Sequence, residues 1–267
     1  MLAKGSHFIL QGGYMVPVWL EAGLWGTVAG LALVLGGAAG FYLRLPRRVI
    51  AGVTAFGSGV LISALAFEMM DKAYERGGIG ATAGGFLGGA IVYTGANWWL
   101  SRKGAKHRKR SGDQQVSEEE HGGSGLAIAV GSALDGIPES ILIGTSMLQG
   151  GVVSLVAVTA IFLSNIPEGL SSAAGMRLAE RSPRYVFSLW GGLAVLLGVA
   201  AAAGYVIFGM FSPAVIAATT AVAAGAILTM LVDTMIPKAF EGSHNFAGLI
   251  TVLGFLAAFA LSKLAGE

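Results

Sequence analysis

The chain has 267 residues, of which 54% are hydrophobic and 12% are charged, and its formal net charge at pH 7 is +2. A soluble domain carries about 25% charged residues, so this composition, with a mean hydropathy of +0.71, excludes an ordinary soluble protein and indicates an integral membrane protein. The absence of cysteine excludes disulfides, thiolate metal sites and cysteine nucleophiles.

Eight apolar segments follow one another along the chain, and each is close to or above the ~20 residues that a helix needs to cross the hydrocarbon. Proline and glycine mark most of the breaks between them, as at Pro46, Gly77–Gly78 and Ser182–Pro183. The sequence therefore predicts an all-α, polytopic membrane helical bundle with eight transmembrane helices, in a single domain over 1–267. The predicted spans are 16–43, 49–71, 79–100, 124–148, 151–176, 185–210, 213–236 and 245–264.

Lysine and arginine gather in the first, third and fifth connections between these spans, around residues 44–48, 101–123 and 177–184. With eight spans these connections fall on one side of the membrane. The positive-inside rule makes that side cytoplasmic, so both termini are expected outside. We interpret 101–123 as a mobile cytoplasmic loop between spans three and four. We expect no nucleic-acid partner for its basic run, and we place the protein in a bacterial inner (plasma) membrane.

Two similar hexapeptides lie near the middle of spans four and five: Asp135-Gly-Ile-Pro-Glu-Ser140 and Ser164-Asn-Ile-Pro-Glu-Gly169. A charged side chain at that depth costs about 3 kcal/mol, and each proline frees a backbone carbonyl. One such motif alone is compatible with a kinked helix and a hydrogen-bonded acid. Two motifs that face each other favour a site for a cation, because three buried carboxylates need a positive partner. The predicted metal ligands are Asp135, Glu139, Ser164, Asn165 and Glu168.

A second internal similarity relates Gly59–Ala73 in span two to Gly225–Ala239 in span seven. These spans cross in opposite directions, so the similarity predicts an inverted repeat in which spans one to three mirror spans six to eight, a 3+2+3 arrangement. Acidic side chains near the ends of these spans are candidates for the entrance and the exit of an ion path, or are interfacial carboxylates that reach water. They are Glu68, Asp71 and Asp233.

The two Pro-Glu motifs resemble those of the ZIP (Zrt/Irt-like) family of divalent metal transporters, which carry His-Asn-x-Pro-Glu-Gly in span four and His-x-x-Pro-Glu in span five. The stretch 232–237 also resembles the acidic Asp-Glu-x-x-Pro motif of that family. The resemblance implies transport of metal into the cytoplasm by alternating access, with an elevator-like movement. It also implies two adjacent metal positions bridged by Glu139 and Glu168.

The chain departs from the family at the histidines. Asp135 and Gly136 stand where the family has His and Asn, Ser164 stands where it has His, and Val195 stands where span six carries a glutamate. It thus resembles a divergent bacterial-type member. Oxygen ligands favour Mg, Ca and Mn, although zinc also accepts carboxylates. We expect a transported zinc, manganese or iron ion and no cofactor.

Two alternative functions and the oligomeric state stay open at this stage. The buried carboxylates also suit a proton or monovalent-cation transporter, and a transport-inactive ZIP relative is compatible with the lost histidines. An enzyme is not expected, because no histidine lies within a span. The expected partners are a divalent cation and the lipid bilayer. The pairs Gly84–Gly85 and Gly88–Gly89 are compatible with a homodimer or with packing inside one chain.

Overall fold

The computed structural model describes residues 8–9, 15–109, 111, 115, 124–148 and 152–265. Two-residue strands β1 (Phe8–Ile9) and β2 (Met15–Val16) pair antiparallel, and nearly all the rest of the described chain is helical. The helices, in which η marks π or 3-10 geometry, are α1 (Val18–Tyr42), α2 (Arg47–Ala64), η1 (Leu65–Met70), α3 (Asp71–Leu100), η2 (Ser101–Ala105), α4 (Ser124–Ser146), α5 (Leu155–Leu178), α6 (Pro183–Phe208), α7 (Pro213–Met230), η3 (Leu231–Met235), α8 (Ile236–Ser243), η4 (His244–Phe246) and α9 (Ala247–Ala265).

Seven helices in the described part of the chain are long and apolar enough to span a membrane, so this is an all-α integral membrane protein. One of them runs from Arg47 to Ala105 and has 59 residues. It is interrupted at Gly78, whose φ of 65° lies in a region that residues with a side chain disfavour. The predicted break at Gly77–Gly78 coincides with this interruption of the helix.

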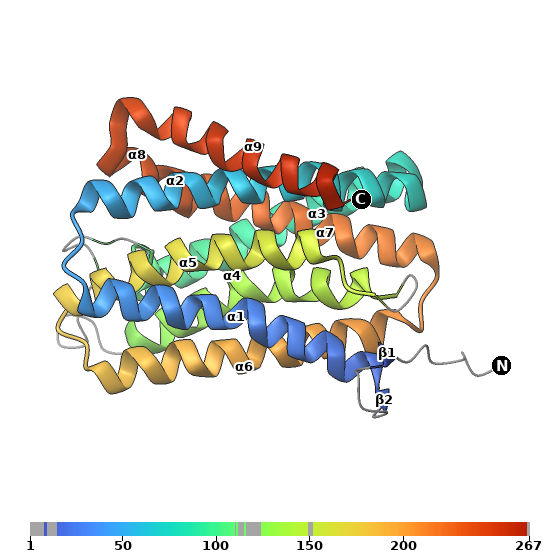
Figure 1. Ribbon diagram of the computed structural model, residues 1–267, viewed down its shortest axis with the longest axis horizontal. Coiled ribbons are helices and arrows are strands. Elements are labelled where there is room, and N and C mark those ends of the chain that lie inside the picture. The colour runs from blue at the N-terminus through green and yellow to red at the C-terminus, as the bar shows by residue number, and fades with distance from the viewer. Residues whose placement is uncertain are drawn as a thin grey trace.

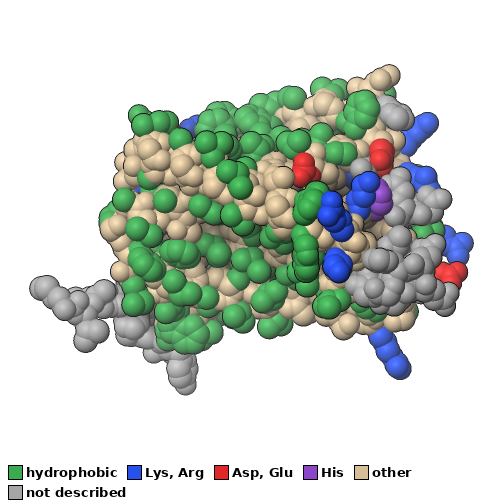
Figure 2. Space-filling view, turned by 180° about the vertical axis from the view of Figure 1, so that it is seen from behind, with side chains coloured by type: hydrophobic (Ala, Val, Ile, Leu, Met, Phe, Trp, Pro, Cys, Tyr) green, Lys and Arg blue, Asp and Glu red, His purple; other side chains and the backbone are tan. Residues whose placement is uncertain are grey.

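The surface is that of a protein surrounded by lipid. In Figure 2 hydrophobic side chains cover the face between the two ends of the molecule, and lysine and arginine side chains gather toward one end. Arg177, at the end of α5, donates hydrogen bonds to the carbonyls of Phe41 and Leu43 at 3.0 and 3.3 Å. The connection between α1 and α2 and the end of α5 therefore meet, so basic residues from these two places gather together, as their distribution in the sequence predicts.

The helices pack in preferred pairs (Figure 1). Helix α1 lies along α5 and α6, α4 lies along α6, α2 lies along α9, and α3 lies along α7. Glycine allows the closest approaches. A Cβ atom on Gly40 of α1 would collide with the carbonyl oxygen of Leu170 in α5, and a Cβ on Gly144 of α4 would collide with that of Ala201 in α6. Such backbone contacts are typical of helices that associate inside a membrane.

The two segments related by sequence also share local structure. Both contain a π-helical turn in the same place, Leu65–Met70 in one and Leu231–Met235 in the other. Gly59 packs against the carbonyl of Thr251 in α9, and Gly225 packs against the carbonyl of Phe86 in α3. The similarity between the segments thus extends from side chains to backbone geometry and to the glycine contact with a neighbouring helix.

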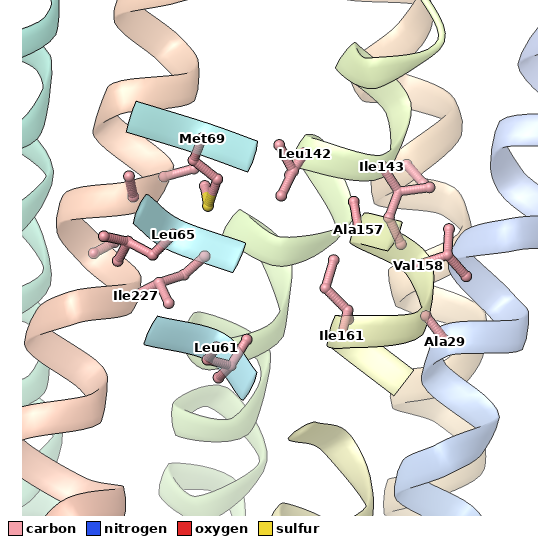
Figure 3. Close-up of a cluster of buried hydrophobic side chains, with 14 of the residues drawn as sticks. Ala29, Leu61, Leu65, Met69, Leu142, Ile143, Ala157, Val158, Ile161 and Ile227 are labelled. Atoms are coloured by element: carbon pink, nitrogen blue, oxygen red, sulfur yellow. The ribbon is translucent and has the colours of Figure 1, made fainter. Parts of the chain in front are cut away.

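A large buried core joins side chains from several helices of the bundle. Figure 3 shows side chains of α2, η1, α4, α5 and α7 that point toward one another there, including Leu61, Leu65, Leu142, Ile161 and Ile227. Each of these five is at most 8% exposed. We call these five residues, Leu61, Leu65, Leu142, Ile161 and Ile227, the apolar layer.

Candidate cation site

Helices α4 and α5 carry the two Pro-Glu motifs into the interior. Both helices continue through their prolines, Pro138 and Pro167, so the prolines do not end either helix. Asp135 and Glu139 are each 1% exposed, and Glu168 is 6% exposed. Three carboxylates thus lie in the interior, as the sequence predicts, and such groups are stable there only when they are paired or neutralised.

Positive charge reaches two of these carboxylates from the protein itself. After η2 the chain forms a turn over 106–109 that brings Arg108 and Lys109 inward, where they are 1% and 4% exposed. Three other basic residues of the same run remain exposed, namely Arg102, Lys103 and Lys106. Arg108 and Lys109, which we call the basic pair, are therefore buried while their basic neighbours are exposed. The sequence instead predicts that the whole run lies in a cytoplasmic loop. The predicted mobility of 101–123 falls partly on positions outside the described residues.

Arg108 holds Asp135 in a two-pronged pair. Its Nε lies 3.0 Å from Oδ2 of Asp135, and its Nη2 lies 2.9 Å from Oδ1. The hydroxyl of Tyr93 donates to Oδ1 of Asp135 at 2.5 Å and accepts from Arg108 at 3.0 Å. Burial alone would lower the pKa of Arg108, but the Asp135 carboxylate raises it above its usual value, so this guanidinium is charged. Planar bidentate pairing of this kind is among the strongest that side chains form.

Lys109 joins the two motifs. Its Nζ lies 3.3 Å from Oδ2 of Asp135 and 3.0 Å from Oε2 of Glu168. One ammonium group therefore contacts a carboxylate from α4 and a carboxylate from α5 at once. The predicted convergence of the two motifs on one site is present for this pair of acids.

The backbone of the basic pair is also bound. The hydroxyls of Ser171 and Ser172 in α5 donate to the carbonyl oxygens of Lys109 and Arg108, respectively. The amide of Gln115 donates to the carbonyl of Arg108 at 3.0 Å. These bonds fix the segment through its main chain, independently of the ion pairs.

Glycine 131 of α4 provides the space for the arginine side chain. A Cβ atom at this position would lie 2.7 Å from Cδ and 2.8 Å from Nε of Arg108. Real Cβ atoms essentially never approach other heavy atoms so closely. A side chain at Gly131 would therefore require the Arg108 side chain to shift from this position.

Glu139 differs from the other two acids. Both of its carboxylate oxygens are buried and lack a hydrogen-bond partner in the described structure. The charges of Glu168 and Asp135 act on it repulsively, and Lys109 acts on it attractively. A buried carboxylate of this kind is costly unless a proton or a cation joins it.

The two remaining predicted ligands of α5 are buried but bond elsewhere. Ser164 donates to the carbonyl of Ile161 at 2.9 Å, and the Asn165 amide donates to the carbonyl of Ala29 in α1 at 3.0 Å. Their donors are thus used within α5 and toward α1. Their side-chain oxygens remain able to accept or to coordinate.

The two predicted entrance acids have different environments. Glu68 is 4% exposed, forms an ion pair with Lys72 at 2.7 Å and accepts from Ser154 and Ser262 at 3.4 and 3.3 Å. It lines an open cavity of about 610 Å³, which we call the vestibule, together with Thr145 of α4. Asp71 is exposed and does not line this cavity.

The predicted exit acid is connected to the basic pair through one residue. Asp233 is exposed and accepts from the Asn97 amide at 3.4 Å, while the oxygen of that amide accepts from Arg108 at 2.9 Å. Val195, at the position of the family's span-six glutamate, is 61% exposed and so faces away from the core.

The sequence therefore identifies the acids but not their partners, Tyr93, Arg108 and Lys109. Among the described residues, no three histidine, cysteine or acidic side chains are grouped so as to hold a metal ion. Comparison with protein-family models and with curated proteins gives no match to this chain.

Proposed function

We propose that this protein transports a divalent metal cation into the cytoplasm by alternating access, as a divergent relative of the ZIP transporters. The observation that carries the proposal is the burial of Asp135, Glu139 and Glu168 on the matching motifs of α4 and α5, where neither oxygen of Glu139 has a hydrogen-bond partner among the described residues. Buried acids on paired helices inside a membrane mark ion pathways in many transporters. Zinc, manganese or iron would be cargo rather than a resident cofactor.

The packing supports eight crossings and an inverted repeat. The 59-residue helix is nearly three times as long as the ~20 residues that a span requires, and Gly78 divides it into 47–77 and 79–105, each long enough for one crossing, so we interpret it as two crossings. The contact of α2 with α9 then corresponds to that of α7 with α3, and the contact of α1 with α5 corresponds to that of α6 with α4. Gly23 and Gly37 of α1 meet Gly198 and Trp190 of α6, so these two helices are antiparallel, as inversion requires.

A path follows from the order of residues along α4. Glu139 belongs to the site, Leu142 belongs to the apolar layer and also lines the inner wall of the vestibule, and Thr145 lines the vestibule one turn farther along. The six residues from Glu139 to Thr145 rise about 9 Å along a helix. In this arrangement the apolar layer separates the vestibule from the carboxylates, and the basic pair separates them from Asp233. The proposed cycle opens these two barriers in turn.

Flux measurements in proteoliposomes test the proposal. We expect uptake of Mn²⁺, Fe²⁺ and Zn²⁺ with weak discrimination, because all the predicted ligands are oxygens. The matched control is the Glu139→Gln protein, which keeps the shape of the side chain and removes the unpaired acid. Uptake of Zn²⁺ with no uptake of Mn²⁺ would contradict the relaxed selectivity. Equal flux through both proteins would contradict the site.

One observation favours a second candidate, a proton or monovalent-cation transporter. When Asp135, Glu139 and Glu168 are all ionised, the two buried bases Arg108 and Lys109 leave one negative charge without compensation. With the basic pair docked, that charge matches a proton or a monovalent ion. Proteoliposomes that contain a pH-sensitive dye distinguish the candidates, because this alternative requires proton or Na⁺ flux without any divalent metal.

A further inference from the structure

We propose that Arg108 and Lys109 form a tethered cationic plug, which occupies the carboxylates of the site when the transported cation is absent and must withdraw before that cation binds. This inference rests on the proposed function, since it concerns the regulation of the same site.

The plug and a metal cation need the same atoms. Arg108 and Lys109 together contact both oxygens of Asp135 and one oxygen of Glu168, at distances between 2.9 and 3.3 Å. A divalent ion on those oxygens would lie next to a guanidinium and an ammonium group in a low-dielectric interior, where like charges repel strongly. Simultaneous occupation is therefore excluded, and the two occupants compete.

The segment that carries Arg108 and Lys109 is also held by hydrogen bonds to its backbone and by steric room for the arginine, in addition to the ion pairs. Ser171 and Ser172 bind its carbonyl groups, Gln115 adds a third hydrogen bond, and Gly131 leaves room for the arginine. Burial of two cations is strongly unfavourable unless their pairing is excellent. The residues around the segment meet that requirement for this conformation of the chain.

The plug arrives from the end of the molecule at which the basic connections meet. It follows η2 directly, and Arg108 is joined through Asn97 to the exposed Asp233. In the proposed orientation this end is cytoplasmic. The plug then closes the site from the cytoplasmic side, on which the cation is released. The rate of uptake therefore depends on the strength of the ion pairs and hydrogen bonds that hold Arg108 and Lys109 in the site.

The first test is independent of any metal and uses the absence of cysteine from the chain. Ser111 is 3% exposed on the docked segment, whereas Lys106 is exposed. We expect the Ser111→Cys protein to react with a water-soluble maleimide at least about tenfold more slowly than the Lys106→Cys protein. Adding Gly131→Ala to Ser111→Cys should remove most of that difference, because the new methyl group displaces Arg108. Equal reactivity of the two single variants would overturn the plug.

The second test measures competition. If the plug is docked in about nine molecules of ten, only the remaining tenth can bind the metal cation. The apparent affinity for the metal is then about tenfold lower than the affinity of the undocked protein. We therefore expect Mn²⁺ and Zn²⁺, each added alone, to bind about tenfold more tightly to the Gly131→Ala protein and to the Arg108→Ala/Lys109→Ala protein than to the parent. The exposed Lys103→Ala variant serves as the control and should match the parent. Either metal should also accelerate labelling of Ser111→Cys in the parent background.

The results separate the two proposals. Equal metal affinity in the parent and the Gly131→Ala protein would overturn the plug and leave the proposed function intact. Weaker binding in both plug variants would also overturn it, because the basic pair would then support the metal rather than replace it. Failure of every protein to bind metal, with slow Ser111→Cys labelling that Gly131→Ala accelerates, would contradict the proposed cargo and support the docked segment.

Discussion

Asp135 and Glu139 lie one helical turn apart at the same 1% exposure, but their surroundings differ. Asp135 is bonded by Arg108, Lys109 and Tyr93, whereas neither oxygen of Glu139 has a hydrogen-bond partner in the part of the chain that the structure describes. An identical loss of charge at the two positions should therefore have opposite effects on stability. Exposure alone does not reveal this difference, because it depends on the groups that each carboxylate contacts.

Replacement of Asp135 by Asn should destabilise the fold. The substitution leaves Arg108 buried without its anionic partner, and removal of one member of a buried ion pair costs about 3–5 kcal/mol. We expect a clear fall in the melting temperature of the purified protein at neutral pH. An unchanged melting temperature would contradict the ion pair.

Replacement of Glu139 by Gln should do the reverse. The amide has the same shape and carries no charge, so the melting temperature should stay the same or rise, because a buried charge without a partner is removed. Cation uptake should fall at least about tenfold, since a proposed ligand is lost. A protein that becomes unstable while it retains uptake would assign Glu139 a structural role.

At the scale of elements, the two stripes of small residues on α3 have different environments. Gly85 and Gly89 contact the backbone of α7, whereas nothing lies within 4 Å of a Cβ placed on Gly84 or Gly88. The sequence left packing within the chain and dimerisation as alternatives for these pairs. The first holds for Gly85 and Gly89, and the other two glycines have no neighbour at that position within the described chain.

Alanine substitutions distinguish the two stripes. Gly89→Ala should destabilise the protein, because the new methyl group collides with the carbonyl of Val222. Gly84→Ala should be neutral or stabilising by up to about 1 kcal/mol, the gain from alanine in a helix interior. Thermal unfolding of the two single variants measures the contrast. Equal effects of the two substitutions on the melting temperature would contradict the backbone contact between Gly89 of α3 and Val222 of α7.

Most of the element boundaries could be predicted from sequence because local residues determine them. Ser182 and Pro183 begin α6, with the serine side chain accepting a hydrogen bond from the Tyr185 amide, and Gly78 interrupts the long helix where its positive φ requires glycine. The exposed and buried basic residues between 102 and 109 could not be told apart. Their environment depends on α4 and α5, which follow later in the chain, and no local pattern distinguishes Lys109 from Lys106.

At the scale of the whole molecule, the proposed orientation places the connection between α6 and α7 outside and the basic connection between α1 and α2 in the cytoplasm. Single cysteines report this directly in a chain that has none. A membrane-impermeant maleimide applied to intact cells should label Phe211→Cys, and it should label Arg48→Cys only after lysis. Both parent residues are exposed. The opposite pattern would invert the topology and place the plug on the outer side.

The pairing of α2 with α9 and of α3 with α7 also bears on how the chain matures. The early helices emerge from the ribosome long before their partners, so the glycine-lined faces of α2 and α3 meet lipid until the last fifth of the protein has been inserted. Neither half can complete its packing alone. A truncated product that ends after α6 would therefore expose these faces to the quality-control proteases of the membrane.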